Sequence, residues 1–164
     1  MPCISRKTKN LFLFITIYYI AKFSKKIYNI CMSQFIMLPS VYDRRGGVSI
    51  IERVLPFSIK RVYYIYDVPA DSVRGGHRHK KNVQALVCVS GSCRINIDDG
   101  AEKSSVVLDS PSKCLVLHPR DWHTMDSFSQ GAVLLVLASE YYDASDYIDE
   151  PYKPDSSSKK GVVK

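Results

Sequence analysis

The stretch RGGHRH, residues 74–79, places two histidines one residue apart, directly after two glycines. Side chains two positions apart on a β-strand project to the same face, so the imidazoles of His77 and His79 converge if this stretch is extended. Packing alone gives no reason for a His-x-His pair behind two glycines. We therefore interpret the pair as the centre of a functional site.

Short β-forming runs surround this stretch from residue 35 to residue 139, separated by turn signals at intervals of about ten residues. No helical period is sustained in this span. The expected strands are residues 49–53, 58–67, 83–89, 93–97, 105–108, 115–118 and 132–139. Seven or eight short strands are typical of an all-β sandwich or a small barrel.

One of these runs, residues 58–67, has two mixed faces. Alternation places Arg61 and Tyr63 on one face with two isoleucines, and a lysine, a valine and two tyrosines on the other. Neither face is clearly a core face or a water face. A barrel with a ligand cavity explains this pattern, because the lining of a cavity mixes apolar side chains with a few placed polar groups.

The charge of the chain is concentrated at its N-terminus. The 164 residues carry a net charge of +7, from 23 Lys and Arg against 16 Asp and Glu. Six of the cations lie in residues 1–31, which contain no acidic residue, so the rest of the chain is close to neutral. Because binding through phosphates needs a persistent basic surface, we expect no nucleic-acid partner.

The same N-terminal segment contains an apolar run, residues 11–21. A helix of that length reaches only about half of a ~30 Å hydrocarbon core, and no small-residue cleavage site follows it. Two interpretations stay open. The segment has a targeting or membrane-surface role, or it is an upstream extension from a misassigned start codon, with Met32 as the working start.

The expected organisation is an N-terminal extension over residues 1–31, one functional domain over residues 32–150, and a Ser- and Lys-rich, disordered tail over residues 151–164. A short helix is expected within residues 141–148. Five widely spaced cysteines form no CxxC pair, so neither a disulfide scaffold nor a zinc site built from cysteines is expected. A reducing cytoplasm is the expected location, with no membrane association for the main domain.

The histidine pair opens a longer pattern, H-x-H-x₄-Q-x₆-G, which runs to Gln84 and Gly91. A second element, PRDWH at residues 119–123, adds His123. The two elements resemble the two signature motifs of the cupin superfamily, whose fold brings such residues together inside a β-barrel. Many cupins bind a metal through these histidines and a glutamate. The glutamate position here is Gln84, a poorer ligand, but three imidazoles can hold zinc or iron, so a metal-dependent cupin oxygenase stays open.

Further segments narrow the resemblance: PFSIKRVYYI (56–65), VCVSGSCR (87–94), LDSP (108–111) and LVLASEYYD (135–143). With the histidine stretch they resemble the nucleotide-sugar 3,4-ketoisomerases, in order and almost without length change, over residues 43–148. The resemblance implies a jelly-roll cupin barrel that moves the ketone of dTDP-4-keto-6-deoxy-D-glucose from C4 to C3 without a metal or another cofactor. It also implies a cytoplasmic, strand-exchanged homodimer that supplies deoxysugars to glycans such as the O-antigen of lipopolysaccharide.

The chemistry of this reaction needs a base of near-neutral pKa, an acid or relay, and a donor to the developing oxyanion. Histidine suits the first two tasks. His77 matches the catalytic base of the family and is assigned removal of the C3 proton. His79 is expected to shuttle a proton or to polarise, and Tyr63 to donate to the enediolate oxygen.

Four more residues receive roles from the resemblance. Arg45 and His123 match the family members that give the galacto product, dTDP-3-keto-6-deoxy-D-galactose. Arg61 and Arg74 match positions near the pocket and are expected to bind the diphosphate of the nucleotide. The open alternatives are a gluco-product ketoisomerase, a dTDP-sugar 3,5-epimerase with a His–Asp pair, and a sugar-binding cupin without catalysis.

Overall fold

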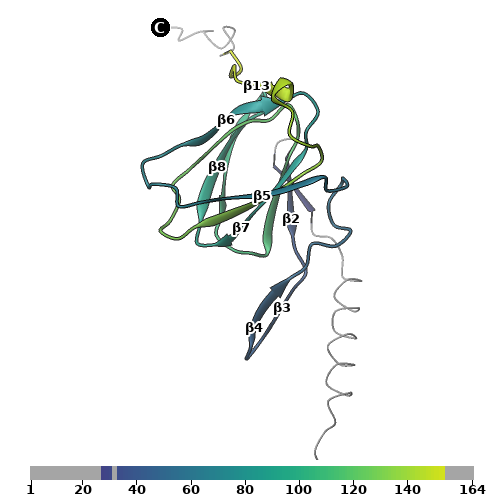
Figure 1. Cartoon of the computed structure of the whole chain (residues 1–164), viewed down its shortest axis with the longest axis vertical. Coiled ribbons are helices and arrows are strands. Elements are labelled where there is room, and N and C mark those ends of the chain that lie inside the picture. The colour runs from purple at the N-terminus through teal and green to yellow at the C-terminus, as the bar shows by residue number, and fades with distance from the viewer. Residues whose placement is uncertain (1–26, 31–32, 154–164) are drawn as a thin grey trace, which may run out of the picture.

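The computed structural model describes residues 27–30 and 33–153, which are mostly β-structure (Figure 1). Every strand pair is antiparallel, and two sheets pack face to face as the jelly-roll barrel of the cupin fold. The expected all-β cupin architecture is therefore confirmed. No helix within the described ranges is long and apolar enough to cross a membrane.

The first sheet has six strands in the order β1-β2-β10-β7-β12-β5. These are β1 (Ile27–Ile30), β2 (Ser33–Met37), β10 (Lys113–Leu117), β7 (Gln84–Ser90), β12 (Val133–Ala138) and β5 (Arg61–Tyr66). The second sheet has five strands in the order β13-β6-β11-β8-β9. These are β13 (Tyr147–Ile148), β6 (Arg74–His79), β11 (Trp122–Asp126), β8 (Cys93–Asp98) and β9 (Lys103–Leu108).

The interior between the sheets is apolar because the strands alternate. On β7, Leu86 and Cys88 point into the barrel, whereas Ala85 and Val87 point to the outer face of the six-stranded sheet. The central strands β7, β10 and β12 therefore carry two apolar faces. On the edge strand β5 the same alternation turns Tyr63 and Ile65 inward, which the mixed pattern of residues 58–67 alone did not decide.

A loop over residues 50–57 covers the outer apolar face of the six-stranded sheet. Its side chains Ile51, Val54, Leu55 and Phe57 pack there. The prediction of a strand over residues 49–53 was wrong for this reason. Ile51 of that run packs its side chain onto the sheet, and Arg53 has φ 54°, which breaks an extended backbone.

Strands β3 (Ser40–Asp43) and β4 (Gly46–Ser49) form a hairpin, here called the arm, that extends away from the barrel at the bottom of Figure 1. Tyr42 and Val48 on the arm are 67% and 60% exposed. Arg45 lies in its turn, with its guanidinium paired to the Asp43 carboxylate. The arm therefore projects two exposed apolar side chains and carries two arginines, Arg44 and Arg45, in its turn.

The two ends of the described chain extend the expected domain slightly. Ile27–Ile30, which we expected in the N-terminal extension, form β1 and pair with β2. The apolar run 11–21, Met32 and residues 154–164 of the tail lie outside the described residues. Past residue 150, Tyr152 donates a hydrogen bond from its hydroxyl to the carbonyl oxygen of Arg120, 2.9 Å away.

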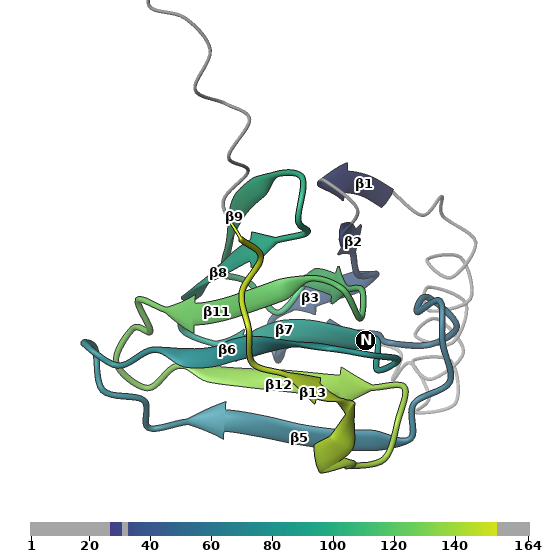
Figure 2. The same cartoon turned by 90° about the horizontal axis from the view of Figure 1, so that it is seen from above.

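The short C-terminal helix is one 3₁₀ turn, η1 (Ala144–Asp146). Its N-cap is Asp143, whose carboxylate accepts hydrogen bonds from the backbone nitrogen and the hydroxyl of Ser145. The chain then enters β13, which pairs with β6 across the end of the barrel (Figure 2). This return brings the C-terminal segment onto the strand that carries the histidine pair.

Candidate active site

Three histidines from two neighbouring strands gather inside the barrel. His77 and His79 lie on β6, and His123 lies opposite His77 on β11. The ring centroids of His77 and His79 are 5.1 Å apart, and those of His77 and His123 are 5.0 Å apart. The structure therefore brings together the histidines of the two motifs, as the sequence predicted.

Glycine is required at position 75 for this approach of β6 to β11. Gly75 has φ +80°, and a Cβ there would lie 2.7 Å from the carbonyl oxygen of His123. The register of the two strands also shifts between His123 and Thr124. The glycine before the histidine pair thus lets the backbones of the strands bearing His77 and His123 come close.

A cavity of about 390 Å³ opens beside the cluster. Its lining comes from β5, β6, β11, β13 and the segment before η1, and consists of Arg61, Tyr63, Ile65, Arg74, Gly75, His77, Met125, Tyr142 and Tyr147. Among the three histidines, only His77 is part of this lining. His79 and His123 are 4% and 1% exposed and lie behind it.

His77 presents a neutral imidazole to the cavity. Burial lowers the pKa of His77 below 6.5, although the Gly75 backbone and the charge of Asp149 oppose this shift. The Tyr147 ring packs against it, with ring centroids 4.8 Å apart. At neutral pH the ring therefore carries a lone pair that can accept a proton.

His79 is held on both sides by buried polar groups. Its Nδ1 lies 3.0 Å from Asp146 Oδ2, and its Nε2 lies 3.2 Å from Gln84 Nε2. Burial is the main cause that lowers the pKa of His79 to about 4, and Asp146 only partly opposes it. The pair is thus a neutral imidazole hydrogen-bonded to a carboxylate, not a salt bridge.

Gln84 continues this chain of polar groups to the cavity. Its Nε2 donates a hydrogen bond to the hydroxyl oxygen of Tyr63, 3.1 Å away. The residue that stands at the metal-ligand position of the cupin pattern therefore links His79 to Tyr63. Burial raises the pKa of Tyr63 to about 12, so its phenol keeps its proton at neutral pH.

His123 is fixed by the backbone and has a free ring nitrogen. Its Nδ1 donates to the carbonyl oxygen of Asp121, 3.0 Å away, and its buried Nε2 has no hydrogen-bond partner among the described residues. Burial lowers the pKa of His123 to about 3. Asp121 is in turn held by Ser33, whose hydroxyl donates to Asp121 Oδ2 at 2.8 Å.

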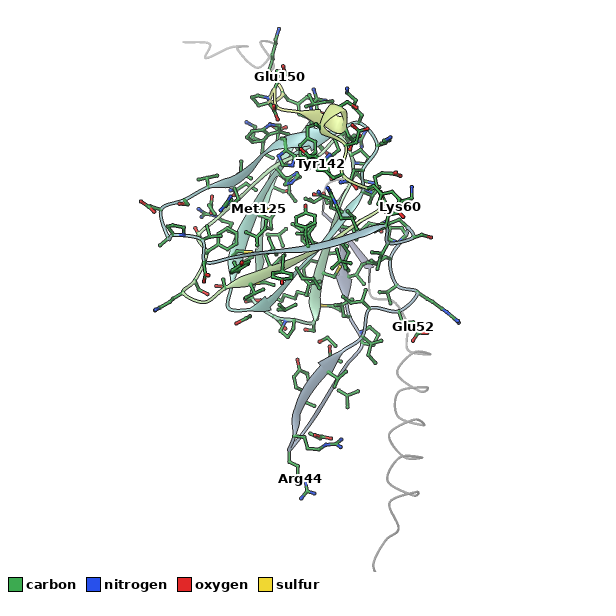
Figure 3. All side chains as sticks on the ribbon, in the orientation of Figure 1. Arg44, Glu52, Lys60, Met125, Tyr142 and Glu150 are labelled. Atoms are coloured by element: carbon green, nitrogen blue, oxygen red, sulfur yellow. The ribbon has the colours of Figure 1, made fainter. Side chains whose placement is uncertain are left out.

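The two expected nucleotide-binding arginines reach the cavity, and Arg45 does not. Arg61 lies over the ring of Tyr63, with its guanidinium carbon 5.0 Å from the ring centroid, and Arg74 lines the same cavity. Figure 3 shows Arg44, the neighbour of Arg45 in the arm, and the cavity residue Tyr142 far apart along the long axis of the molecule.

Three site residues were not predicted from the sequence: Asp146, Tyr142 and Tyr147. Tyr142 belongs to a segment that carried the family resemblance, but no spacing rule shows that this segment returns across β6. The signal that could have found Asp146 is its place in a short acidic, tyrosine-rich run after the last long strand. Over the described ranges, no group of three or more His, Cys, Asp or Glu side chains is placed to hold a metal ion.

The cupin-type barrel thus holds a cavity lined by a neutral histidine, a protonated tyrosine and two arginines. This lining suits acid–base chemistry on an anionic substrate. The chain belongs to the FdtA family, because the family model described as "FdtA: WxcM-like, C-terminal" matches residues 31–155. It is 48% identical over 118 residues to the TDP-4-oxo-6-deoxy-alpha-D-glucose-3,4-oxoisomerase of Aneurinibacillus thermoaerophilus, covering 71% of this chain and 85% of that relative.

Solved structures of related enzymes have the same fold. A double mutant of the QdtA 3,4-ketoisomerase from Thermoanaerobacterium thermosaccharolyticum matches with a TM-score of 0.72 and 44% identity, over 74% of this chain and 89% of that one. The WlaRB TDP-quinovose 3,4-ketoisomerase from Campylobacter jejuni matches with a TM-score of 0.70 and 41% identity, over 74% and 95%. The chain is therefore an enzyme, an isomerase of the 3,4-ketoisomerase type.

Proposed function

We propose that this isomerase converts dTDP-4-keto-6-deoxy-D-glucose to dTDP-3-keto-6-deoxy-D-galactose, without a metal, through an enediol intermediate. The observation that carries the proposal is that His77 and Tyr63 line one cavity, the first as a neutral base and the second as a protonated donor. The names of the relatives support the substrate. The Aneurinibacillus enzyme is named for TDP-4-oxo-6-deoxyglucose, and a QdtA mutant is a complex with TDP-4-keto-6-deoxyglucose.

The proposed reaction begins when the lone pair of His77 removes the C3 proton of the sugar. The electrons of the C3–H bond form the C3–C4 double bond, and negative charge develops on the C4 oxygen. Tyr63 donates a hydrogen bond to that oxygen. The C4 oxygen is then protonated, the C3 hydroxyl loses its proton, and a proton added to C4 completes the 3-ketone. His79, behind the cavity wall, polarises Tyr63 through Gln84.

A histidine base is also supported by one of the relatives. The QdtA complex with TDP-4-keto-6-deoxyglucose is that of a mutant in which a histidine is replaced by asparagine. A variant that retains the sugar nucleotide fits a histidine used for turnover more than for binding. We assign that role here to His77 because it is the histidine of the cluster that lines the cavity.

Arg61 and Arg74 are proposed to bind the diphosphate. Both line the cavity, and Arg61 Nε is buried without a hydrogen-bond partner among the described residues. Guanidinium groups pair with phosphate oxygens through several N–H donors. QdtA structures in complex with TDP show that an enzyme of this family type holds such a nucleotide.

The galacto product is proposed from Arg45 and His123. Relatives of both product types exist, because the two Campylobacter enzymes are named for TDP-quinovose and TDP-fucose, a gluco and a galacto sugar. In the QdtA double mutant a tyrosine is replaced by arginine and an arginine by histidine. Those two introduced residue types are the ones this chain carries at positions 45 and 123.

Arg45 can act at the site only if a second copy supplies it, since the arm points away from its own cavity. We therefore propose a strand-exchanged homodimer in which the arm of each copy reaches the other. The exposed side chains of Tyr42 and Val48 support this proposal because they would be buried in such a contact.

We also propose a cytoplasmic location, supported by the free, buried thiols of Cys88, Cys93 and Cys114. The proposed biological role is the supply of deoxysugars for O-antigen-type glycans.

A 3,5-epimerase is the second candidate, favoured by the buried His79–Asp146 pair. Two epimerases share the fold, NovW at 19% identity with a TM-score of 0.65 and a dTDP-4-dehydrorhamnose 3,5-epimerase at 15% with a TM-score of 0.66. The carboxylate here, however, contacts His79 and not the cavity residue His77.

The direct test is to incubate the full chain with dTDP-4-keto-6-deoxy-D-glucose, with and without EDTA, and to identify the product by NMR after trapping with a 3-aminotransferase. We expect the trapped product of both samples to carry an amino group at C3, which reports the C3 ketone, and an axial C4 hydroxyl. An equatorial hydroxyl would overturn the galacto assignment alone. Inversion at C5 with the ketone still at C4 would show an epimerase. Binding of the sugar nucleotide without turnover would show a sugar-binding cupin, and loss of activity in EDTA would show a metal-dependent enzyme.

A further inference from the structure

We propose that Asp146 is a positioning residue for the isomerisation. By fixing the proton of His79 on Nδ1, it makes Gln84 donate to Tyr63, and this leaves the phenolic proton of Tyr63 to point into the cavity. The inference rests on the proposed function, in which Tyr63 donates to the enediolate oxygen. It gives a role to the buried carboxylate that the reaction itself does not use.

The polar chain is closed to water over most of its length. Asp146 and His79 are each 4% exposed and Gln84 is 1% exposed. The hydrogen-bond partners of Asp146, His79 and Gln84 Nε2 therefore lie within the protein, because an unmade hydrogen bond in the interior costs the desolvation of the group. Gln84 Oε1 is buried without a partner among the described residues. The direction of each hydrogen bond along this chain of groups is then set by the one group that can only accept hydrogen bonds.

Asp146 is that group, since an ionised carboxylate only accepts hydrogen bonds. Its Oδ1 accepts from the backbone nitrogen of Lys81 at 3.0 Å, and its Oδ2 faces His79 Nδ1 at 3.0 Å. A neutral imidazole has one N–H, and the carboxylate draws it to Nδ1. The Nε2 of His79 is thereby left as an acceptor.

The donors on the far side of His79 are fixed in turn. The two N–H groups of the Gln84 amide point to His79 Nε2 and to the hydroxyl oxygen of Tyr63. Because that oxygen already accepts a hydrogen bond from Gln84, its own proton is free for another acceptor. Tyr63 lines the cavity, so that acceptor is a bound substrate oxygen.

The reverse direction would remove the donor from the reaction. If His79 carried its proton on Nε2, the amide of Gln84 would have to turn its oxygen toward both His79 and Tyr63. Tyr63 would then donate to Gln84 and face the substrate with lone pairs only. This arrangement would also set the Nδ1 lone pair of His79 against the Asp146 carboxylate, which is repulsive.

The experiment measures whether Asp146 acts through the Tyr63 proton. Asp146→Asn can donate to His79 Nδ1 and so permits the reverse direction. We expect kcat for dTDP-4-keto-6-deoxy-D-glucose to fall about 10- to 100-fold, as when the partner that orients a histidine is removed, with KM nearly unchanged. In a Tyr63→Phe background the same substitution should have almost no further effect, because the proton it orients is absent.

The outcomes separate this inference from the proposed function. If Tyr63→Phe leaves kcat unchanged, the donor role of Tyr63 in the proposed function fails. If Tyr63→Phe lowers kcat but Asp146→Asn costs the same factor in both backgrounds, Asp146 acts independently of Tyr63 and only the present inference is overturned. Asp143→Ala is the matched control, because it loosens the same 3₁₀ turn through its N-cap but leaves the carboxylate on His79.

A second variant keeps the test decisive if Asp146→Asn fails to fold. Gln84→Glu is nearly isosteric, and its carboxylate can only accept, so Tyr63 must donate to it and turn its proton away from the cavity. We expect Gln84→Glu to lower kcat by about the same factor as Tyr63→Phe. The double variant should have the kcat of Tyr63→Phe alone. ¹⁵N NMR of the His79 ring in the full-length enzyme gives an independent readout. A proton on Nε2 in the parent protein would contradict the inference.

Discussion

At the scale of single residues, the site depends on imidazoles that burial keeps neutral. His77 faces the cavity and is free to accept a proton, while the hydrogen bonds of His79 and His123 to Asp146 and to the Asp121 carbonyl fix their tautomers. The three imidazoles therefore have different surroundings, which the sequence motifs alone do not distinguish. Two pH effects follow, one on activity and one on stability.

The activity should depend on the protonation of His77. Burial lowers the pKa of this base below its ordinary 6.5, so we expect the acid limb of kcat/KM to be centred below pH 6.5. The pH dependence of initial rates, with product quantified by NMR, checks this. An acid limb centred above pH 6.5 would show that the base is not a buried, neutral His77.

The stability should fall in acid because His79 and His123 resist protonation in the folded state. Burial lowers their pKa values to about 4 and about 3, from 6.5 in an exposed chain. Between these values the unfolded chain binds more protons than the folded one, so the free energy of unfolding decreases as pH falls from 6.5 toward 4. The combined loss is on the order of a few kcal/mol.

Urea unfolding at pH 7 and pH 5, compared between the parent and His123→Asn, measures this effect. Asparagine can still donate to the Asp121 carbonyl but does not titrate. The variant should be less stable than the parent at pH 7 and should lose less stability on acidification. An identical loss in the two proteins would show that His123 does not contribute to the pH dependence.

At the scale of elements, β6 is the strand that organises the site. It carries two cluster histidines, pairs with β11 through Gly75, and pairs with β13 next to Asp146. Gly75 and Gly76 both have φ +80°, but only a Cβ at position 75 would meet the neighbouring strand. The two glycines therefore provide a matched pair for separating backbone strain from strand displacement.

We expect Gly76→Ala to cost about 1–2 kcal/mol of stability from its left-handed backbone alone. Gly75→Ala should cost more, because its methyl group would displace the backbone of His123, and it should also lower kcat by moving that ring. Thermal unfolding and steady-state kinetics of the two variants check this. Equal effects of the two substitutions would show that the close approach of β6 to β11 is unimportant.

The sequence predicted the elements whose pattern is local. Alternation in residues 58–67 indicated β5, and the turn residues after residue 89 indicated the break between β7 and β8. The expectation that these two strands pair as a hairpin was wrong, because β7 belongs to the six-stranded sheet and β8 to the five-stranded sheet. Prediction from the sequence also failed for residues 49–53, where the apolar run covers a sheet instead of forming a strand. Asp146 could not be predicted as a partner of His79 because the contact depends on a chain return 67 residues away.

At the scale of the whole molecule, the arm is the feature that a single copy does not explain, because it lies away from the cavity of its own barrel. It also holds Arg45, which the family resemblance ties to the reaction. A homodimer with exchanged arms accounts for both facts. This proposal predicts that the oligomeric state and the product stereochemistry change together.

We expect the parent protein to sediment as a dimer, and Tyr42→Asp with Val48→Lys on the arm to shift it toward the monomer. The same double variant should lose stereochemical control at C4, because Arg45 no longer reaches a partner cavity. Analytical ultracentrifugation and product NMR measure the two effects. Val107→Lys, at an exposed apolar position on β9, is the control. A monomeric parent with full stereochemical control would contradict the exchanged arm.

In the proposed function, removal of the C3 proton by His77 is the step on which the whole reaction depends. The most direct measurement compares turnover of dTDP-4-keto-6-deoxy-D-glucose by His77→Asn and by His118→Asn, a histidine that does not line the cavity. We predict that His77→Asn lowers kcat by roughly 10²- to 10⁴-fold while dTDP binding survives, and that His118→Asn turns over like the parent. Undiminished turnover by His77→Asn would contradict this assignment of the base.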